Sequence, residues 1–281
     1  MQILDGKALS KKIEAEVAEG VKKLKSETSR VPGLAVILVG NDPASHAYVG
    51  MKKKACDRVG FYSVTHEMPE TISQEAIEQT IDMMNKNPNI DGILIQLPLP
   101  KHIDTTRLLE IVAPQKDVDG FHPYNVGRLA TGLDGFVPCT PLGVMELFKE
   151  YNIDLKGKDA VVVGASDIVG KPMAALLLNA NATVTVTHIY TKDLAAHTRS
   201  ADIVLVGAGV INLIKEDMVK DGAIVIDIGI NRNEEGRLVG DVDFENVSRK
   251  CSYITPVPGG VGPMTIAILL KNTLKAAQAN S

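Results

Sequence analysis

Cysteine, long apolar runs and net charge are all scarce in this sequence, and each scarcity excludes a class of protein. The 3 cysteines, Cys56, Cys139 and Cys251, are odd in number, widely separated and outside metal-ligand spacing, so we expect free thiols in a reducing compartment. No apolar run approaches the roughly 18 residues that a membrane span needs, and the first residues lack the apolar core of a signal peptide. The sequence therefore predicts a cytoplasmic protein with no membrane partner.

The formal net charge of -4 gives no overall attraction to nucleic acid, so nucleic acid is not an expected partner. An anionic ligand would instead be attracted by a local cluster, such as Lys52, Lys53 and Lys54. The 6 histidines fall in no metal-ligand cluster, and no G-x-S-x-G motif occurs. We therefore expect neither a metal centre nor a serine hydrolase site.

Short β-branched runs alternate with helical patterns along the chain, which is typical of parallel sheets with crossover helices. In the first half, the pattern predicts buried strands over 34–40 and 92–98 and helices over 43–59 and 105–112. A length of 281 residues exceeds the common single-domain size. The predicted fold class is therefore α/β, with two α/β domains.

The pattern breaks between residues 114 and 141, where the sequence is rich in turns, and we place the domain boundary there. Four later apolar runs predict a Rossmann-like, doubly wound parallel sheet: DAVVVGAS, ATVTVTH, ADIVLVGAG and GAIVIDIGI. The expected domains are residues 1–138, completed by a C-terminal helix within 264–281, and residues 139–263, with a cleft between them.

The segment GASDIVGKP follows one of these strands and precedes a helical pattern, as a phosphate-binding turn does. Gly164 suits a tight turn close to a pyrophosphate, Gly170 suits close packing on the sheet, and Ser166 offers a hydroxyl at the helix N-terminus. The spacing differs from GxGxxG, so this turn alone is equally compatible with a purely structural role. Glycine-containing loops after three further strands, GAGV, GIN and PGGVGPMT, favour a nicotinamide cofactor.

Four polar residues of the first domain are candidates for the chemistry. Tyr48 and Lys52 are four apart in a helical pattern, so they share a face and can share a proton, although a solvated surface pair has the same spacing. Gln96 lies within an apolar strand, where its amide needs a hydrogen-bond partner, either a ligand or nearby backbone. Asp119, like Asp117, lies in a turn, where aspartate commonly makes local contacts.

Together these segments resemble the methylenetetrahydrofolate dehydrogenase/methenyltetrahydrofolate cyclohydrolase family over nearly the whole chain. The motifs that carry the resemblance are NDPASHAYVGMKKKAC, GILIQLPLP, KDVDGFHPYNVGRL, PCTPLGVMELF, VVGASDIVGKP, AIVIDIGINR, GDVDF and TPVPGGVGPMT. The resemblance implies oxidation of methylenetetrahydrofolate with a nicotinamide dinucleotide and hydrolysis of the methenyl product to formyltetrahydrofolate. It also implies a homodimer formed through the cofactor domain.

The resemblance assigns roles to individual residues on the folate side. Tyr48 would pack on and orient the folate, and Lys52 would be the central acid/base group. Gln96 would hydrogen-bond Lys52, and Asp119 would bind the pterin ring. The other residues expected to line the substrate site are Pro258 and Gly259. Hydride transfer from the methylene carbon needs no general base, so Lys52 would serve the hydrolytic step.

The cofactor side departs from the family at the adenosine end. The resemblance places the dinucleotide along Gly164, Ser166 and Ile230, with Thr265 near the nicotinamide. NADP-using members typically carry an arginine at one of two positions, which are Ala165 and Ile189 in this chain. The nearest substitutes are Thr191 and Lys192, and no acidic residue ends the second strand to bind a free ribose hydroxyl. NADP is the expected cofactor, and NAD is the alternative.

Two other functions are weighed against this expectation. A different NAD(P)-dependent enzyme on the same architecture would need another catalytic set, and the chain supplies none. A member with weak dehydrogenase activity, acting mainly as a cyclohydrolase, would be explained by the altered adenosine pocket and the retained Lys52. The apolar segment MAALLLNANA and the strand after it are the candidate dimer face, although core packing would explain them equally.

Overall fold

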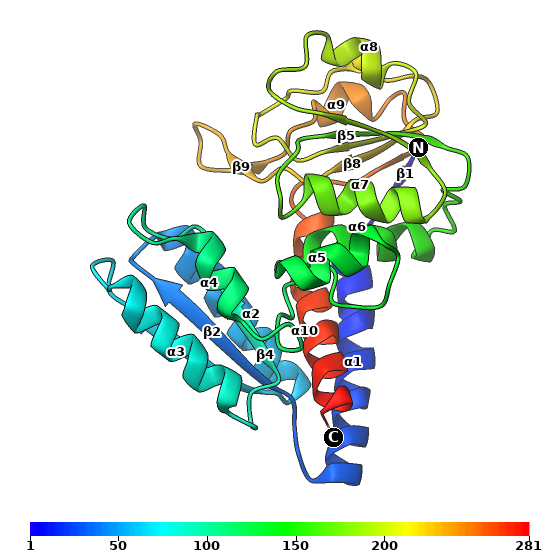
Figure 1. The fold of residues 1–281 in the computed structure, drawn as a ribbon. Helices are drawn as coiled ribbons and strands as arrows, with labels where there is room; N and C mark the ends of the chain where they lie inside the picture. Colours follow the sequence, from blue (N-terminus) through cyan, green and yellow to red (C-terminus); the bar gives the residue numbers. More distant parts are fainter. Residues whose placement is uncertain (281) are drawn as a thin grey trace. The chain divides into compact units, whose positions relative to one another are not determined.

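The computed structural model describes residues 1–280 and divides the chain into two compact units. One unit is built on a three-stranded sheet and comprises residues 11–128, 133–137 and the C-terminal stretch from Ile266. The other is built on a six-stranded sheet and comprises residues 1–10, 129–132 and 138–265. Figure 1 shows the helices and strands of both units.

The three-stranded unit contains a parallel sheet with helices packed against it. Its strands are β2 (Gly33–Val39), β3 (Tyr62–Met68) and β4 (Gly92–Ile95), in the order β3-β2-β4. Its helices are α2 (Pro43–Val59), α3 (Gln74–Lys86), α4 (Thr105–Ile111) and α5 (Pro123–Ala130). Strand β2 is buried along its whole length, as expected of a central parallel strand.

Alternate residues of β2 face different layers of the core. Ala35, Ile37 and Val39 join one hydrophobic cluster with Ile77 and Ile81 of α3. Because successive strand residues point to opposite faces, the intervening buried residues of β2 point to the other face of the sheet. Helix α2 packs on β2 and β3, which gives the helix that carries Tyr48 and Lys52 a fixed position on the sheet.

Two long helices, α1 (Gly6–Thr28) and α10 (Val261–Ala279), have their longer parts in the three-stranded unit. They run side by side there (Figure 1), and Gly20 of α1 allows the close approach: a Cβ at this position would lie 2.5 Å from Cδ2 of Leu274 in α10. The last predicted helix, residues 264–277, is therefore present as the longer α10, and its C-terminal part belongs to this unit.

The six-stranded unit contains a fully parallel sheet in the order β1-β11-β8-β7-β5-β6. Its strands are β1 (Gln2–Ile3), β5 (Asp159–Val163), β6 (Thr183–Thr187), β7 (Ile203–Val206), β8 (Ile224–Asp227) and β11 (Tyr253–Ile254). Helices α6 (Cys139–Glu150), α7 (Gly170–Asn179), α8 (Leu194–Thr198) and α9 (Phe244–Val247), the 3-10 helix Glu216–Met218 and the hairpin β9 (Asn231–Arg232) to β10 (Leu238–Val239) complete it. The strand order reverses at β5, as in doubly wound folds.

Three elements have no clear signal in the sequence. Strand β1 pairs with β11 in the six-stranded sheet, through Gln2 opposite Tyr253 and Ile3 opposite Ile254, although the expected first domain starts at residue 1. Strand β3 is an edge strand with partly exposed side chains, so it lacks a continuous apolar run. Helix α5 lies in the turn-rich stretch and is only 8 residues long. Among residues 1–280, no helix has both the length and the apolar character that crossing a membrane requires.

Candidate active site

Local interactions close both ends of helix α2, which carries Tyr48 and Lys52. Asp42 caps the N-terminus by accepting a hydrogen bond from the Ser45 amide at 2.7 Å, and Pro43 occupies the first turn. At the other end Gly60 has a φ of 86°, and its amide donates to the Cys56 carbonyl at 3.0 Å. Both ends are therefore closed by local interactions, as the predicted helix over 43–59 requires.

The structure brings Lys52 and Gln96 together. Lys52 is only 7% exposed, and its Nζ donates a hydrogen bond to Gln96 Oε1 at 3.0 Å. Gln96 follows β4 directly, and its backbone amide donates to the Ile37 carbonyl of β2 at 2.9 Å. Its side-chain Nε2 donates to the Leu97 carbonyl at 2.8 Å. Because the amide nitrogen is held by backbone, the amide oxygen faces the lysine.

Tyr48 lies one turn before Lys52 on the same helix, and Cys56 lies one turn after it. Burial raises the pKa of the half-buried Tyr48, so the phenol keeps its proton at neutral pH. Burial also raises the pKa of the Cys56 thiol to about 12, against a smaller opposing effect from Lys52. Such a thiol is a poor nucleophile at neutral pH. This face of α2 therefore offers a phenol and an amine for chemistry, but no thiolate.

The two aspartates of the KDVDG turn have different surroundings. The carboxylate of Asp117 is buried and accepts hydrogen bonds from the Phe121 and His122 amides, at 3.1 and 2.8 Å, and from Asn125 Nδ2 at 2.8 Å. Asp117 thus makes the local turn contacts that the sequence allowed for both residues. Asp119 is half-buried, in a loop that pairs with β4 through a bridge between Ile93 and Asp117. The loop therefore brings Asp119 to the strand that leads to Gln96.

The turn after β5 depends on two glycines. Gly164 has a φ of 115°, and a Cβ there would lie 2.5 Å from the Gly207 carbonyl oxygen. A Cβ on Gly170, the first residue of α7, would lie 2.0 Å from the Gly164 carbonyl oxygen. Ser166 Oγ accepts from the Val169 and Gly170 amides at 3.2 and 3.3 Å. A glycine-containing turn and the N-terminus of α7 thus lie beside the strand at which the strand order reverses. This arrangement is suited to binding a dinucleotide phosphate.

The loop after β6 exposes apolar side chains where the family resemblance suggested an arginine in NADP-using members. Ile189 is 89% exposed and Tyr190 is 82% exposed. Thr191 closes the loop, because its Oγ1 accepts from the His188 amide at 3.0 Å and its own amide donates to the His188 carbonyl at 2.9 Å. Lys192 follows as an exposed cation. Across the phosphate turn, Ala165 is half-buried and adds no charge.

The remaining predicted site residues also lie in the six-stranded unit. Ile230, in the loop after β8, is 44% exposed. Thr265 is half-buried, and its hydroxyl lies 2.8 Å from that of Thr140. Pro258 is exposed and follows a cis peptide bond, and Gly259 has a φ of 106°. The Gly259 carbonyl accepts from the Lys7 amide at 2.9 Å, which ties this loop to the start of α1.

The sequence patterns alone did not identify two candidate functional residues, Asp227 and Asp241. Both carboxylates are buried, at 3% and 0% exposure, beneath the loops that follow β7 and β8. The available signals were an acidic residue at the end of the apolar run AIVID for Asp227 and an aspartate after a glycine for Asp241, which also describes ordinary turns. Residues 1–280 contain no group of three or more histidine, cysteine, aspartate or glutamate side chains arranged to hold a metal ion.

Comparison with known proteins identifies two family domains in the chain. Residues 4–119 match the catalytic domain of tetrahydrofolate dehydrogenase/cyclohydrolase, and residues 138–281 match its NAD(P)-binding domain. The bifunctional protein FolD of Sulfurimonas denitrificans is 79% identical over 100% of this chain and 99% of its own length.

Solved structures give the same result. The FolD methylenetetrahydrofolate dehydrogenase/cyclohydrolase of Campylobacter jejuni is 58% identical, with a TM-score of 0.99 and 100% of both chains covered. The Trypanosoma brucei enzyme, solved with NADP and an inhibitor, is 41% identical, with a TM-score of 0.95 over 99% of this chain and 97% of that one. The predicted α/β class and the predicted enzyme, a methylenetetrahydrofolate dehydrogenase and methenyltetrahydrofolate cyclohydrolase, are confirmed. The chain therefore belongs to the tetrahydrofolate dehydrogenase/cyclohydrolase family.

Proposed function

We propose that Lys52 is the acid/base group of the cyclohydrolase reaction and that NADP is the cofactor of the dehydrogenase reaction. The observation that carries the first proposal is the hydrogen bond between the buried Lys52 Nζ and Gln96 Oε1. A buried amine held by a neutral amide at the end of a strand keeps a fixed position in either protonation state, because an amide oxygen accepts from both forms.

The hydrolytic step needs two protons to leave the attacking water and one to be delivered to N5, so that one proton is released overall. Water adds to the cationic methenyl carbon and loses a proton; the bond from this carbon to N5 then breaks, N5 is protonated, and the remaining hydroxyl proton leaves to solvent as the formyl carbonyl forms. Lys52 takes the first proton and can return it to N5, so that one amine serves both transfers. Gln96 holds the amine in place, and the protonated phenol of Tyr48, one helical turn before Lys52, would orient the folate.

Replacing Lys52 with methionine tests this role, because methionine keeps the length of the side chain and removes the amine. We expect Lys52→Met to lower the cyclohydrolase rate by at least about a hundredfold and to reduce the dehydrogenase rate less. Lys53→Met is the matched control, since Lys53 is the next residue of α2 and is exposed. An unimpaired cyclohydrolase rate in Lys52→Met would refute the assignment.

We also propose that Asp119 binds the pterin ring, with Pro258 and Gly259 as further folate contacts. A carboxylate accepts hydrogen bonds from adjacent ring N–H and amino groups, which the pterin presents along one edge. The half-buried position of Asp119, beside the fully engaged Asp117, supports this role.

The residues of the six-stranded unit fit a dinucleotide. Gly164, Ala165 and Ser166 would contact the phosphates, Ile189 the adenosine, Ile230 the middle of the molecule and Thr265 the nicotinamide. The bound NADP would supply the two-electron acceptor for oxidation of the methylene carbon. The protein's own part is to hold the turn in a compact path at the edge of the sheet, which the close packing of Gly164 and Gly170 against backbone supports.

Lys192 is the proposed partner of the 2′-phosphate. The Thr191 hydroxyl already accepts from the His188 amide, whereas Lys192 is an exposed cation in the same loop. We expect Lys192→Ala to raise KM for NADP several-fold and to leave KM for NAD unchanged. Lys156→Ala is the control, because Lys156 is exposed and precedes the amino end of β5, away from the loops at the carboxyl ends. Faster turnover with NAD than with NADP in the unmodified protein would overturn the cofactor assignment.

We propose that two copies of the chain associate through β6 and α7. Strand β6 is at the edge of the sheet, and an edge strand presents unpaired backbone groups. Val186 of β6 is 37% exposed and Leu178 of α7 is 63% exposed, so apolar side chains accompany this edge. Sedimentation should give a dimer for the unmodified protein and a monomer for Val186→Lys; a monomeric unmodified protein would contradict the proposal.

A further inference from the structure

The loops after β7 and β8 are joined by a buried carboxylate. Asp241 is 0% exposed, and its Oδ2 accepts hydrogen bonds from the amides of Ala208 and Gly209 at 2.6 and 2.9 Å. Its Oδ1 accepts from Asn231 Nδ2 at 2.8 Å. One side chain thus fixes the backbone that follows β7 and the side chain of Asn231, which begins β9 directly after the loop that follows β8.

A second buried carboxylate fixes the first. Asp227, the last residue of β8, is 3% exposed, and its Oδ1 accepts from the amides of Gly229 and Asp241, both at 3.0 Å. Its Oδ2 accepts from the Val242 amide at 2.9 Å. Its own amide donates to Thr255 Oγ1 at 2.7 Å, which ties it to the end of β11. Asp227 therefore holds the backbone from which the Asp241 side chain projects.

Glycines make room for both carboxylates. A Cβ on Gly229 would lie 2.3 Å from Asp241 Cγ, and a Cβ on Gly240 would lie 1.8 Å from Asp227 Oδ2. A shift of either carboxylate would therefore change the path of the loop that contains Ile230. The loop after β7 is equally constrained, because Gly164 of the phosphate turn packs against the Gly207 carbonyl.

Burying two neighbouring carboxylates costs free energy. Burial, with a smaller contribution from the neighbouring Asp241, raises the pKa of Asp227 to about 6, against the lowering effect of its backbone donors. Removing carboxylates from water costs free energy that the surrounding N–H groups must offset. Together, the six N–H donors hold two loops in a fixed path. These loops lie at the edge where parallel sheets bind dinucleotides.

We propose that Asp241 and Asp227 are positioning residues for the nicotinamide dinucleotide: they fix the loops after β7 and β8 in the conformation that binds the cofactor. The proposal rests on the proposed NADP site at this edge. Neither carboxylate touches the reacting atoms, so their effect is on cofactor affinity and not on the hydrolytic chemistry of Lys52.

The test compares cofactor binding with cyclohydrolase activity in Asp241→Ala. Two backbone amides and the Asn231 amide lose their acceptor, so we expect the Kd for NADP, measured by calorimetry, and its KM to rise about tenfold or more. Cyclohydrolase activity, assayed with methenyltetrahydrofolate and no dinucleotide, should stay within about twofold of the unmodified protein. Asp243→Ala is the matched control, because Asp243 is two residues away and its carboxylate accepts from Asn246 Nδ2 at 2.7 Å, outside the two loops.

Two outcomes would overturn the proposal. An unchanged Kd for NADP in Asp241→Ala with normal cyclohydrolase activity would show that the loops need no anchor. A parallel loss of both activities would show a purely structural role. If Asp241→Ala does not fold, Asp241→Asn gives the same test: one acceptor oxygen remains for Ala208 and Gly209, so a smaller rise, about threefold, is expected. Failure of the unmodified protein to bind NADP would instead contradict the proposed cofactor.

Discussion

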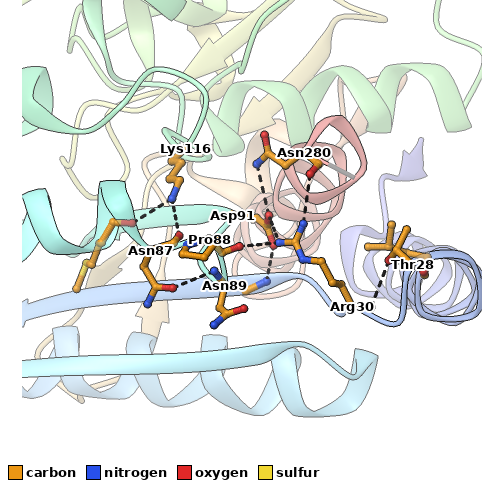
Figure 2. Close-up of polar contacts among 11 residues, drawn as sticks. Thr28, Arg30, Asn87, Pro88, Asn89, Asp91, Lys116 and Asn280 are labelled. Carbon is orange, nitrogen blue, oxygen red and sulfur yellow. Dashed lines mark hydrogen bonds and ion pairs between the residues drawn. The ribbon is translucent and has the colours of Figure 1, made fainter.

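The two ends of the three-stranded sheet use buried polar groups differently. At the carboxyl end, the buried Lys52 is held by the side-chain amide of Gln96. At the amino end, Arg30, Asp91 and Lys116 bond to backbone groups of several segments (Figure 2). We therefore expect Lys52 to be the lysine that exchanges a proton with a ligand, and Lys116 to be the lysine that holds segments of the fold together.

Asp91 joins several segments by hydrogen bonds at the amino end of the sheet (Figure 2). Asp91 is 1% exposed; its Oδ1 accepts from Arg30 Nη2 at 3.1 Å and its Oδ2 from the Gly33 amide at 3.0 Å. Arg30 also donates to the carbonyls of Pro88 and Asn280, at 2.8 and 3.3 Å. The first residue of β2, the residue before β4 and the end of the chain thus meet in one network.

Lys116 closes helix α3 at the same end. Its Nζ donates to the carbonyls of Met84 and Asn87 at 3.1 and 2.8 Å, in addition to the backbone amides of Asn87 and Ile90 that these carbonyls accept from (Figure 2). The two buried lysines of this unit therefore differ in their partners and not in their burial, since both are 7% exposed. Burial alone does not identify a catalytic lysine.

The largest expected effect concerns the amino end. Asp91→Ala leaves the partly buried Arg30 and the Gly33 amide without their acceptor, so we expect a loss of about 3–5 kcal/mol in the free energy of unfolding. Urea denaturation measures it. Asp82→Ala removes an exposed ion pair of α3 and should cost less than about 1 kcal/mol. Equal losses for the two variants would contradict the importance given to the network.

The two neighbouring aspartates of the KDVDG turn sharpen the comparison within one loop. We expect Asp119→Ala to raise the Kd for the folate substrate about tenfold or more, because charge-assisted hydrogen bonds to the pterin are lost. Asp117→Ala should instead lower stability, since three N–H groups lose their acceptor. Folate titration and thermal unfolding of both variants separate the two effects, and an unchanged folate affinity in Asp119→Ala would remove it from the site.

Gln96→Ala tests whether the amide holds the catalytic amine. The variant removes the acceptor of Lys52 Nζ and leaves the backbone bond to Ile37 intact. We expect the cyclohydrolase rate to fall about tenfold, less than in Lys52→Met, with a changed pH profile because the environment of the amine has changed. A rate and pH profile equal to those of the unmodified protein would show that Gln96 is only a structural residue.

The smallest expected effect is a pH dependence of stability at the amino end. Burial lowers the pKa of Lys116, so between this lowered value and the ordinary value of 10.5 the unfolded chain binds more protons than the folded one. Stability therefore gains a contribution as the pH rises through this interval toward 10.5. Lys116→Met should lack that contribution in urea denaturation at several alkaline pH values. The same pH dependence in both proteins would assign it to other groups.

The sequence predicted the elements that have strong local signals. Helix α2 begins and ends at the predicted residues 43 and 59, because Asp42, Pro43 and Gly60 mark its ends. The buried strands over 34–40 and 92–98 were predicted to within a few residues. Strand β1 could not be predicted, because its pairing with β11 joins residues about 250 positions apart and depends on tertiary structure.

The candidate site also contains residues that could be predicted from the sequence and residues that could not. Lys52 and Gln96 were expected to bond on the basis of the family resemblance, and the structure contains that bond. Asp227 and Asp241 were missed, because Asp241 looks like an ordinary turn residue, Asp227 ends an apolar strand, and their contact spans 14 positions, 227 to 241. The resemblance singled out Asp119 for the pterin, but spacing alone could not show that the Asp117 carboxylate would be occupied by local N–H groups, since both residues lie in one turn.

One pair of variants tests the central comparison most directly: Lys52→Met and Lys116→Met, each measured for cyclohydrolase rate per folded molecule and for free energy of unfolding. We predict that Lys52→Met loses the rate by at least about a hundredfold and stays folded, whereas Lys116→Met keeps the rate and loses about 1–3 kcal/mol of stability. A Lys52→Met protein that hydrolyses methenyltetrahydrofolate at the unmodified rate would contradict the account.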